Sequence, residues 1–123
     1  MSRSILLQLA RDSIAEVLEA RRTINKQSLL EQHPLLNQKI QTQINLYIDK
    51  ELRGSSKSNF ASYTLLEDIV RNAKKSAFED KNFKPISTSE YLSCEVEIVL
   101  TTDDGVISET DKPIVTDPQE MKL

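Results

Sequence analysis

Apolar and polar residues follow each other along this chain with two different periods, and each period predicts its own kind of element. From Ser4 to about Arg22 the apolar residues recur every three or four positions, which is the spacing of an amphipathic helix. The face that we expect to be buried contains Leu6, Leu9, Ala10, Ile14, Val17 and Leu18. The face that we expect to be polar contains Gln8, Arg11, Asp12, Glu16 and Glu19.

A second helix is predicted from about Tyr63 to Asp80, and Pro85 prevents its continuation. Its buried stripe consists of Leu66, Ile69, Val70, Ala73 and Ala77. The basic residues that lie outside this stripe are Arg71, Lys74 and Lys75. After the first helix, residues 23–38 are mostly polar and contain Pro34, so we expect a connector with a short helical turn.

Strict alternation of apolar and polar residues predicts strands in two other segments. Residues 40–49 alternate throughout, and residues 93–101 alternate with Cys94 among the inward positions. Asp104-Gly105 is a hairpin signal, and a return strand is predicted to start at Val106. A tight turn is expected at residues 49–51, and the polar stretch 55–62 is expected to form a second strand and then a loop.

These elements predict an α+β fold, a mostly antiparallel sheet with two main helices packed on it. The length of 123 residues fits one domain, which we assign to residues 1–115. The remaining residues, 116–123, are polar and are expected to form a mobile C-terminal tail.

The formal net charge of −3 is unevenly distributed along the chain. Residues 90–123 carry nine acidic and two basic side chains, whereas residues 50–89 carry five acidic and eight basic ones. Because proteins that bind nucleic acid through overall charge are usually basic, we do not expect nucleic acid as the main partner. The acidic final quarter instead favours a basic partner.

Rare residue types exclude several classes of site. One cysteine and one histidine exclude an intrachain disulfide and a zinc site of the His/Cys type, and two glycines are too few for a phosphate-binding loop. We therefore predict no metal and no cofactor. The chain contains no run of 18 apolar residues and no secretory signal at its start, so we expect a cytoplasmic protein without membrane contact.

The segment Arg53-Gly54-Ser55, with Lys57 nearby, is the best candidate for a ligand site. Gly54 permits close approach of the backbone, Ser55 offers a hydroxyl, and an arginine can hold a carboxylate or phosphate through two hydrogen bonds. The structural alternative is the start of a strand with a bulge and a surface ion pair. No residue is assigned a catalytic role, because the sequence contains no evident pair of nucleophile and base.

A basic surface is the second candidate. Lys57, Arg71, Lys74 and Lys75 can join Arg53 in a small basic face, and the nearby aromatic residues Phe60 and Tyr63 make a surface for RNA or a nucleotide conceivable. The alternative is ordinary charge on an exposed helix, since Glu67 stands four residues before Arg71 and can pair with it.

Two single residues are given structural roles. Cys94 points inward on its strand and is expected to be a buried, unreactive thiol. His33 precedes Pro34 in the connector and is expected at the surface or at a helix end.

Several segments resemble the AMMECR-type domain family, which is protein A of the AmmeMemoRadiSam system. Residues 6–14 are similar to the first helix of the family, and Glu51-Leu52-Arg53-Gly54 is similar to the start of its Leu-Arg-Gly-Cys-Ile-Gly signature. Residues 66–73, 77–80 and 83–85 resemble its second helix and the following turn, and residues 95–98 resemble the next strand. The order and spacing of these segments agree across about residues 5–115.

The resemblance implies an α+β fold with helices on a mostly antiparallel sheet, in a family whose biochemical activity is unsettled. It also implies radical-SAM or Memo-like proteins as partners in a shared modification pathway. The chain departs from the family at Ser55, where the signature has cysteine, at Ser56 and Lys57, and at Lys81-Asn82. It also lacks the Gly-rich, Trp-containing portion with which the family continues, so we expect a divergent, shortened member.

Three functions follow from these observations. The first is a non-enzymatic interaction or accessory module that forms a homodimer or binds a protein partner at an exposed sheet edge. The second is an enzyme or enzyme component that binds a small anionic substrate or nucleotide at Arg53-Gly54-Ser55. The third, for which the charge gives less support, is an RNA-binding surface across residues 53–75.

Overall fold

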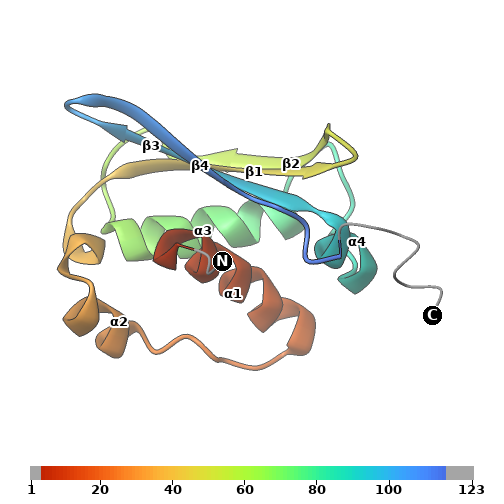
Figure 1. Ribbon diagram of the computed structural model, residues 1–123, viewed down its shortest axis with the longest axis horizontal. Helices are drawn as coiled ribbons and strands as arrows, with labels where there is room; N and C mark the ends of the chain where they lie inside the picture. Colours follow the sequence, from red (N-terminus) through yellow and green to blue (C-terminus); the bar gives the residue numbers. More distant parts are fainter. Residues whose placement is uncertain (1–3, 116–123) are drawn as a thin grey trace.

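All helices lie on one face of a four-stranded sheet (Figure 1). This arrangement is seen in a computed structural model that describes residues 4–115, and the tail predicted at 116–123 lies outside the described residues. The elements are α1 (Ile5–Glu19), α2 (Lys26–Gln32), the 3-10 helix η1 (Pro34–Asn37), β1 (Gln41–Ile48), β2 (Glu51–Lys57), α3 (Leu65–Phe78), α4 (Thr88–Ser93), β3 (Glu95–Thr102) and β4 (Gly105–Asp111).

The sheet has the order β2-β1-β3-β4, and every pair of neighbours is antiparallel. The β1–β2 hairpin turns at Asp49 and Lys50, whose φ angles of 51° and 68° match the right-handed twist of the flanking strands. β1 and β3 pair from Gln41 opposite Thr101 to Tyr47 opposite Glu95. The predicted α+β fold is therefore confirmed.

The core lies between α1, α3 and the inner face of the sheet. Inward residues of β1 and β3 alternate with outward ones, as the sequence predicts, and the buried set includes Ile44, Leu46, Val96 and Ile98. α1 and α3 contact each other as well as the sheet, so both main helices contribute their apolar stripes. No helix within residues 4–115 has the length and apolar character needed to cross a membrane.

Side-chain caps define where the helices begin. Ser4, Thr64 and Ser87 each accept a hydrogen bond from a backbone N–H in the first turn of α1, α3 and α4 respectively. At α4 the Glu90 side chain also accepts from the Ser87 N–H, which completes a capping box. α4 is not among the elements predicted from the sequence, although Ser87 followed by Glu90 is the signature of a capping box.

Two predictions about α1 are wrong. Arg11 was placed on the polar face, yet it is only 1% exposed, because its guanidinium reaches the backbone carbonyls of Tyr91, Cys94 and Lys112. Val17 was placed on the buried face, yet it is 46% exposed beside a hollow at the end of α1. The predicted burial of Cys94 is confirmed, although the residue lies at the end of α4, directly before β3. Burial raises the pKa of its thiol.

Candidate functional site

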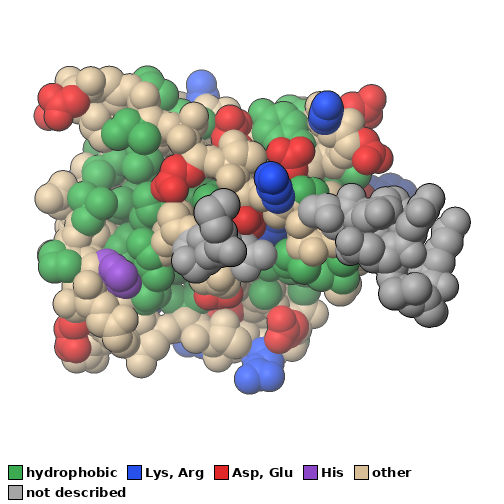
Figure 2. All heavy atoms as spheres, viewed as in Figure 1, with side chains coloured by type: hydrophobic (Ala, Val, Ile, Leu, Met, Phe, Trp, Pro, Cys, Tyr) green, Lys and Arg blue, Asp and Glu red, His purple; other side chains and the backbone are tan. Residues whose placement is uncertain are grey.

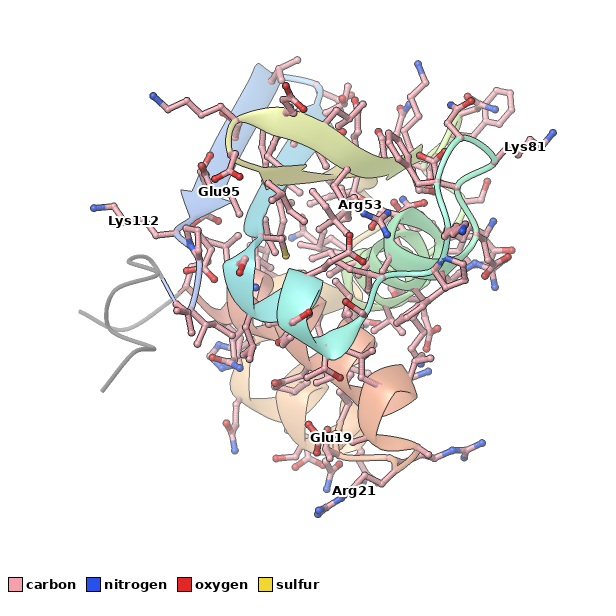
Figure 3. The ribbon with its side chains drawn as sticks, turned by 90° about the vertical axis from the view of Figure 1, so that its right-hand side faces the viewer. Glu19, Arg21, Arg53, Lys81, Glu95 and Lys112 are labelled. Carbon is pink, nitrogen blue, oxygen red and sulfur yellow. The ribbon has the colours of Figure 1, made fainter. Side chains whose placement is uncertain are left out.

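Arg53 occupies a bulge in β2. Gly54 lies opposite Leu46 and Leu52 lies opposite Tyr47, so Arg53 is an extra residue in the β1–β2 ladder. The extra residue turns the Arg53 side chain away from the sheet and toward the segment between α3 and α4 (Figure 3). The structure therefore contains the β-bulge that was expected if Arg53 has a structural role and does not bind a ligand.

The guanidinium of Arg53 is held by Glu90. Nε donates to Oε2 at 2.8 Å and Nη2 donates to Oε1 at 3.1 Å, while Nη2 also donates to the carbonyl of Lys84 at 2.8 Å. The ring of Phe83 lies 5.5 Å from the guanidinium carbon. The hydrogen bonds from Arg53 lower the pKa of Glu90 to about 2, although desolvation opposes them. Among the described residues, the buried Nη1 finds no hydrogen-bond partner.

Gly54 is required by the close approach of β2 to α3. A Cβ atom at this position would lie 2.0 Å from the carbonyl oxygen of Ser76, far inside van der Waals contact. The absent side chain thus makes room for a helix backbone, which is a sufficient structural reason for glycine here.

Ser55 lies on the face of the sheet that carries no helix. Its hydroxyl donates to Asn45 Oδ1 at 2.6 Å, and its backbone N–H donates to Asp80 Oδ2 at 2.9 Å. Asn45 in turn donates to Glu97 at 2.8 Å, and the Tyr47 hydroxyl donates to the same carboxylate at 3.2 Å. Burial, followed by the negative charge of Glu97, raises the pKa of Tyr47. These contacts form a continuous polar chain across three strands.

The predicted basic surface separates into two parts. Lys74 turns toward α1, donates to Glu16 at 3.2 Å and lines a hollow of about 960 Å³ at the end of that helix. Desolvation raises the pKa of Glu16, but hydrogen bonds from the Ile24 and Thr23 N–H groups and from Lys74 outweigh it, so the pKa is lowered. Lys74 therefore stabilises the chain reversal that follows α1.

Lys57, Arg71 and Lys75 instead line a second groove, of about 300 Å³, beside the loop that connects β2 to α3. Phe60 and Tyr63 of that loop line the same groove. We call it the 57–75 groove. Arg53 is not among its lining residues, so the structure brings together only part of the predicted set.

A buried polar network lies beneath the 57–75 groove. Asp68 accepts hydrogen bonds from the Thr42 N–H and hydroxyl through Oδ2, and from the Ser58 hydroxyl through Oδ1. The Asn72 amide donates to Thr42, Ser58 and Asp68, and its oxygen accepts from Ser56. Sequence reasoning missed this network, because Asp68 and Asn72 look like surface residues of a helix until β1 and β2 are placed against them.

The two edges of the sheet differ. β2 is covered in part by the segment after α3, through Asp80 and Lys84. β4 is the other edge, and it exposes Val106 by 68% and Ile107 by 55%. Figure 2 shows hydrophobic side chains gathered on the left of the molecule, the side on which the tip of the β3–β4 hairpin lies in Figure 1.

His33 lies apart from Ser55. It caps the end of α2 and lines an apolar hollow of about 430 Å³ together with Leu35, Leu36 and Glu109.

Residues 4–115 contain no cluster of three or more side chains suited to hold a metal ion.

Comparison with known proteins identifies a family and a similar solved structure. A family model described as AMMECR1 matches residues 7–119 of the chain. The crystal structure of the uncharacterized protein PH0010 from Pyrococcus horikoshii is similar, with a TM-score of 0.70 and 27% sequence identity. That similarity covers 79% of this chain and 49% of PH0010, so the chain spans about half the length of that protein. Among curated proteins, none matches the chain.

Proposed function

The chain belongs to the AMMECR1 family, and we propose that it acts within that family as a non-enzymatic interaction module that binds a strand of a protein partner along β4. The observation that carries the proposal is the contrast between the two edges of the sheet. The polar groups of Arg53 and Ser55 are largely engaged inside the molecule, whereas β4 presents exposed apolar side chains along an open edge.

The contacts of Ser55 favour binding over catalysis. A serine hydroxyl needs a base to become a nucleophile, yet this hydroxyl donates to the amide oxygen of Asn45, which is not a base. The single histidine lies on a different side of the fold, and Cys94 is fully buried with a raised pKa. None of these groups is arranged as a pair of nucleophile and base.

β4 has the properties of a strand that accepts another strand. It is seven residues long, it forms the edge of the sheet, and neither a helix nor a loop pairs with its outer side among the described residues. An added strand would satisfy the outward backbone groups of β4 and would cover Val106 and Ile107.

The charge around β4 favours a partner different from this chain. Asp103, Asp104 and Glu109 lie in or beside the β3–β4 hairpin, so a second copy would bring like charges together. We therefore expect a strand with apolar and basic side chains. Radical-SAM and Memo-like proteins, the partners implied by the family resemblance, are the first to test.

The test compares two exposed valines. The purified chain is immobilised and exposed to an extract of cells that naturally contain this protein. The retained proteins are identified by mass spectrometry. Val106→Lys should abolish retention of the specific partner, whereas Val17→Lys, a matched change on α1, should leave it intact. Equal retention by both variants, or a stable dimer of the chain in sedimentation, contradicts the proposal.

One observation favours a second function, binding of a small anion at Arg53. Its Nη1 is buried and has no partner among residues 4–115, and a buried unpaired donor is costly enough to call for one. A metabolite that raises the melting temperature of the native chain but not that of Arg53→Lys would support this alternative. A screen in which no anion distinguishes the two proteins would exclude it.

A further inference from the structure

The 57–75 groove combines three cations with two aromatic rings. Lys57 comes from the end of β2, Phe60 and Tyr63 come from the following loop, and Arg71 and Lys75 stand one turn apart on α3. Within the part of the chain that the structure describes, no aspartate or glutamate lines this groove. Its lining is therefore basic, although the protein as a whole carries a net charge of −3.

The Tyr63 ring orients the Arg71 guanidinium, and the nearby Glu67 does not neutralise its charge. Its guanidinium carbon lies 4.4 Å from the centre of the Tyr63 ring, a stacking contact that uses one face of the group and leaves its N–H donors at the edge. The carboxylate expected to pair with it, Glu67, instead accepts from Lys26 at 2.8 Å. Arg71 thus keeps the planar set of donors that binds phosphate oxygens in pairs.

The floor of the groove is already satisfied. Ser58 and Asn72 line the groove, but their side chains are engaged with Asp68 and Thr42 in the network beneath it. Asp68 is itself buried, and its oxygens accept from four donor groups. The groups that can meet a ligand are therefore at the rim, namely the cations, the rings and the exposed loop residues Asn59 and Ser62, all above a rigid base.

Phe60 adds an exposed aromatic ring to the groove. It is 75% exposed, so its ring is accessible to a planar ligand. Planar bases stack on such rings, while cations beside them hold the phosphates. The volume of about 300 Å³ is at the small end for a ligand site, and the negative protein around it disfavours a long polyanion.

We infer that the 57–75 groove binds a nucleotide, with its phosphates on Lys57, Arg71 and Lys75 and its base on Phe60. This inference is independent of the proposed role of β4, because the groove lies at the opposite edge of the sheet, beside β2.

The experiment is a titration of the full chain with four probes: ATP, adenosine, tripolyphosphate and a ten-nucleotide oligouridylate. Binding is measured by amide NMR shifts or by calorimetry. ATP should bind and should shift the amides of residues 57–63 and 71–75, whereas adenosine and tripolyphosphate, which each lack one half of the ligand, should bind at least about tenfold more weakly. A decamer of oligouridylate tests for an extended nucleic acid. Tighter binding of the decamer than of ATP would overturn the inference in favour of an RNA surface.

Variants separate the two halves of the site. Arg71→Gln and Phe60→Ala should each weaken ATP binding about tenfold, and both positions are exposed, so the variants should stay folded. Arg22→Gln and Leu52→Ala are matched exposed controls away from the groove and should bind ATP normally. Equal affinity for ATP and tripolyphosphate, or an unchanged affinity in Phe60→Ala, would overturn the assignment of the base.

Discussion

Arg11 and Asp111 join the first helix to the last strand through a hydrogen-bonded ion pair, in which Nε donates to Oδ2 at 2.7 Å. The same guanidinium donates to the carbonyls of Cys94 at 2.8 Å and Lys112 at 3.0 Å. The contact therefore fixes α1 against the last residue of β4 and against Cys94, which directly precedes β3. The open edge of β4 is held in place by a charge pair that is almost completely buried.

Replacement of Arg11 tests this connection. Arg11→Met removes a buried cation and leaves Asp111 and three backbone carbonyls with fewer donors, so we expect the free energy of unfolding to fall by about 3 to 5 kcal/mol. Lys26→Met, which breaks an exposed pair with Glu67, should cost under about 1 kcal/mol. Urea unfolding measures both values, and a loss for Arg11→Met no larger than that of the control would contradict this account.

Gly54 and Gly105 should respond differently to the same substitution. Gly54→Ala places a Cβ atom against the Ser76 carbonyl, and relief requires β2 to move away from α3, so we expect a cost of about 3 kcal/mol or more. Gly105 has a φ of 128° but open space around it, so Gly105→Ala should cost only about 1 kcal/mol from backbone strain. Thermal and urea unfolding should rank the variants in this order. A Gly54→Ala protein as stable as Gly105→Ala would exclude a rigid contact between β2 and α3.

The Arg53–Glu90 pair should make stability depend on pH. The folded-state pKa of Glu90, about 2, lies below its ordinary value of 4.5, so the pair stabilises the protein fully above about pH 5 and loses that effect as the pH falls toward 2. Glu90→Gln keeps a side chain that can complete the capping box but removes the charge. The difference in unfolding free energy between the two proteins should therefore shrink in acid and with added salt. A difference that stays constant from pH 7 to pH 3 would show that the charge of Glu90 does not contribute.

The elements that the sequence predicts correctly are those with a long, regular pattern. α1, α3, β1 and β3 each repeat their apolar positions over many residues, and Asp104-Gly105 marks the tight turn between β3 and β4. α4 is too short to show a period, and its capping signature is only two residues. Arg11 could not be placed from α1 alone, because its partners lie between 80 and 101 residues further along the chain.

The candidate sites show the same limit. Lys74 and Lys75 are adjacent in sequence but about 100° apart around α3, so one contacts Glu16 while the other lines the 57–75 groove. The composition predicted a basic surface with aromatic residues, but only the positions of α1 and of the β2–α3 loop decide which cations meet. Glu67 pairs with Lys26 and not with Arg71, and this could not be predicted without the position of α2, which carries Lys26.

Cys94 and a cysteine introduced at Ser55, the position of the cysteine in the family signature, should differ in thiol reactivity. Cys94 is fully buried and its pKa is raised, first by desolvation, so iodoacetamide should modify it slowly in the native protein and readily in urea. Because the folded protein keeps this proton to a higher pH than the unfolded chain does, formation of the thiolate in alkali should favour unfolding. Ser55→Cys adds a half-buried thiol on the helix-free face, where the reagent should modify it faster than Cys94. Mass spectrometry of the labelled peptides distinguishes the two sites. Faster labelling of Cys94 than of the cysteine at position 55 would mean that the junction of α4 and β3, where Cys94 contacts α1, opens in solution.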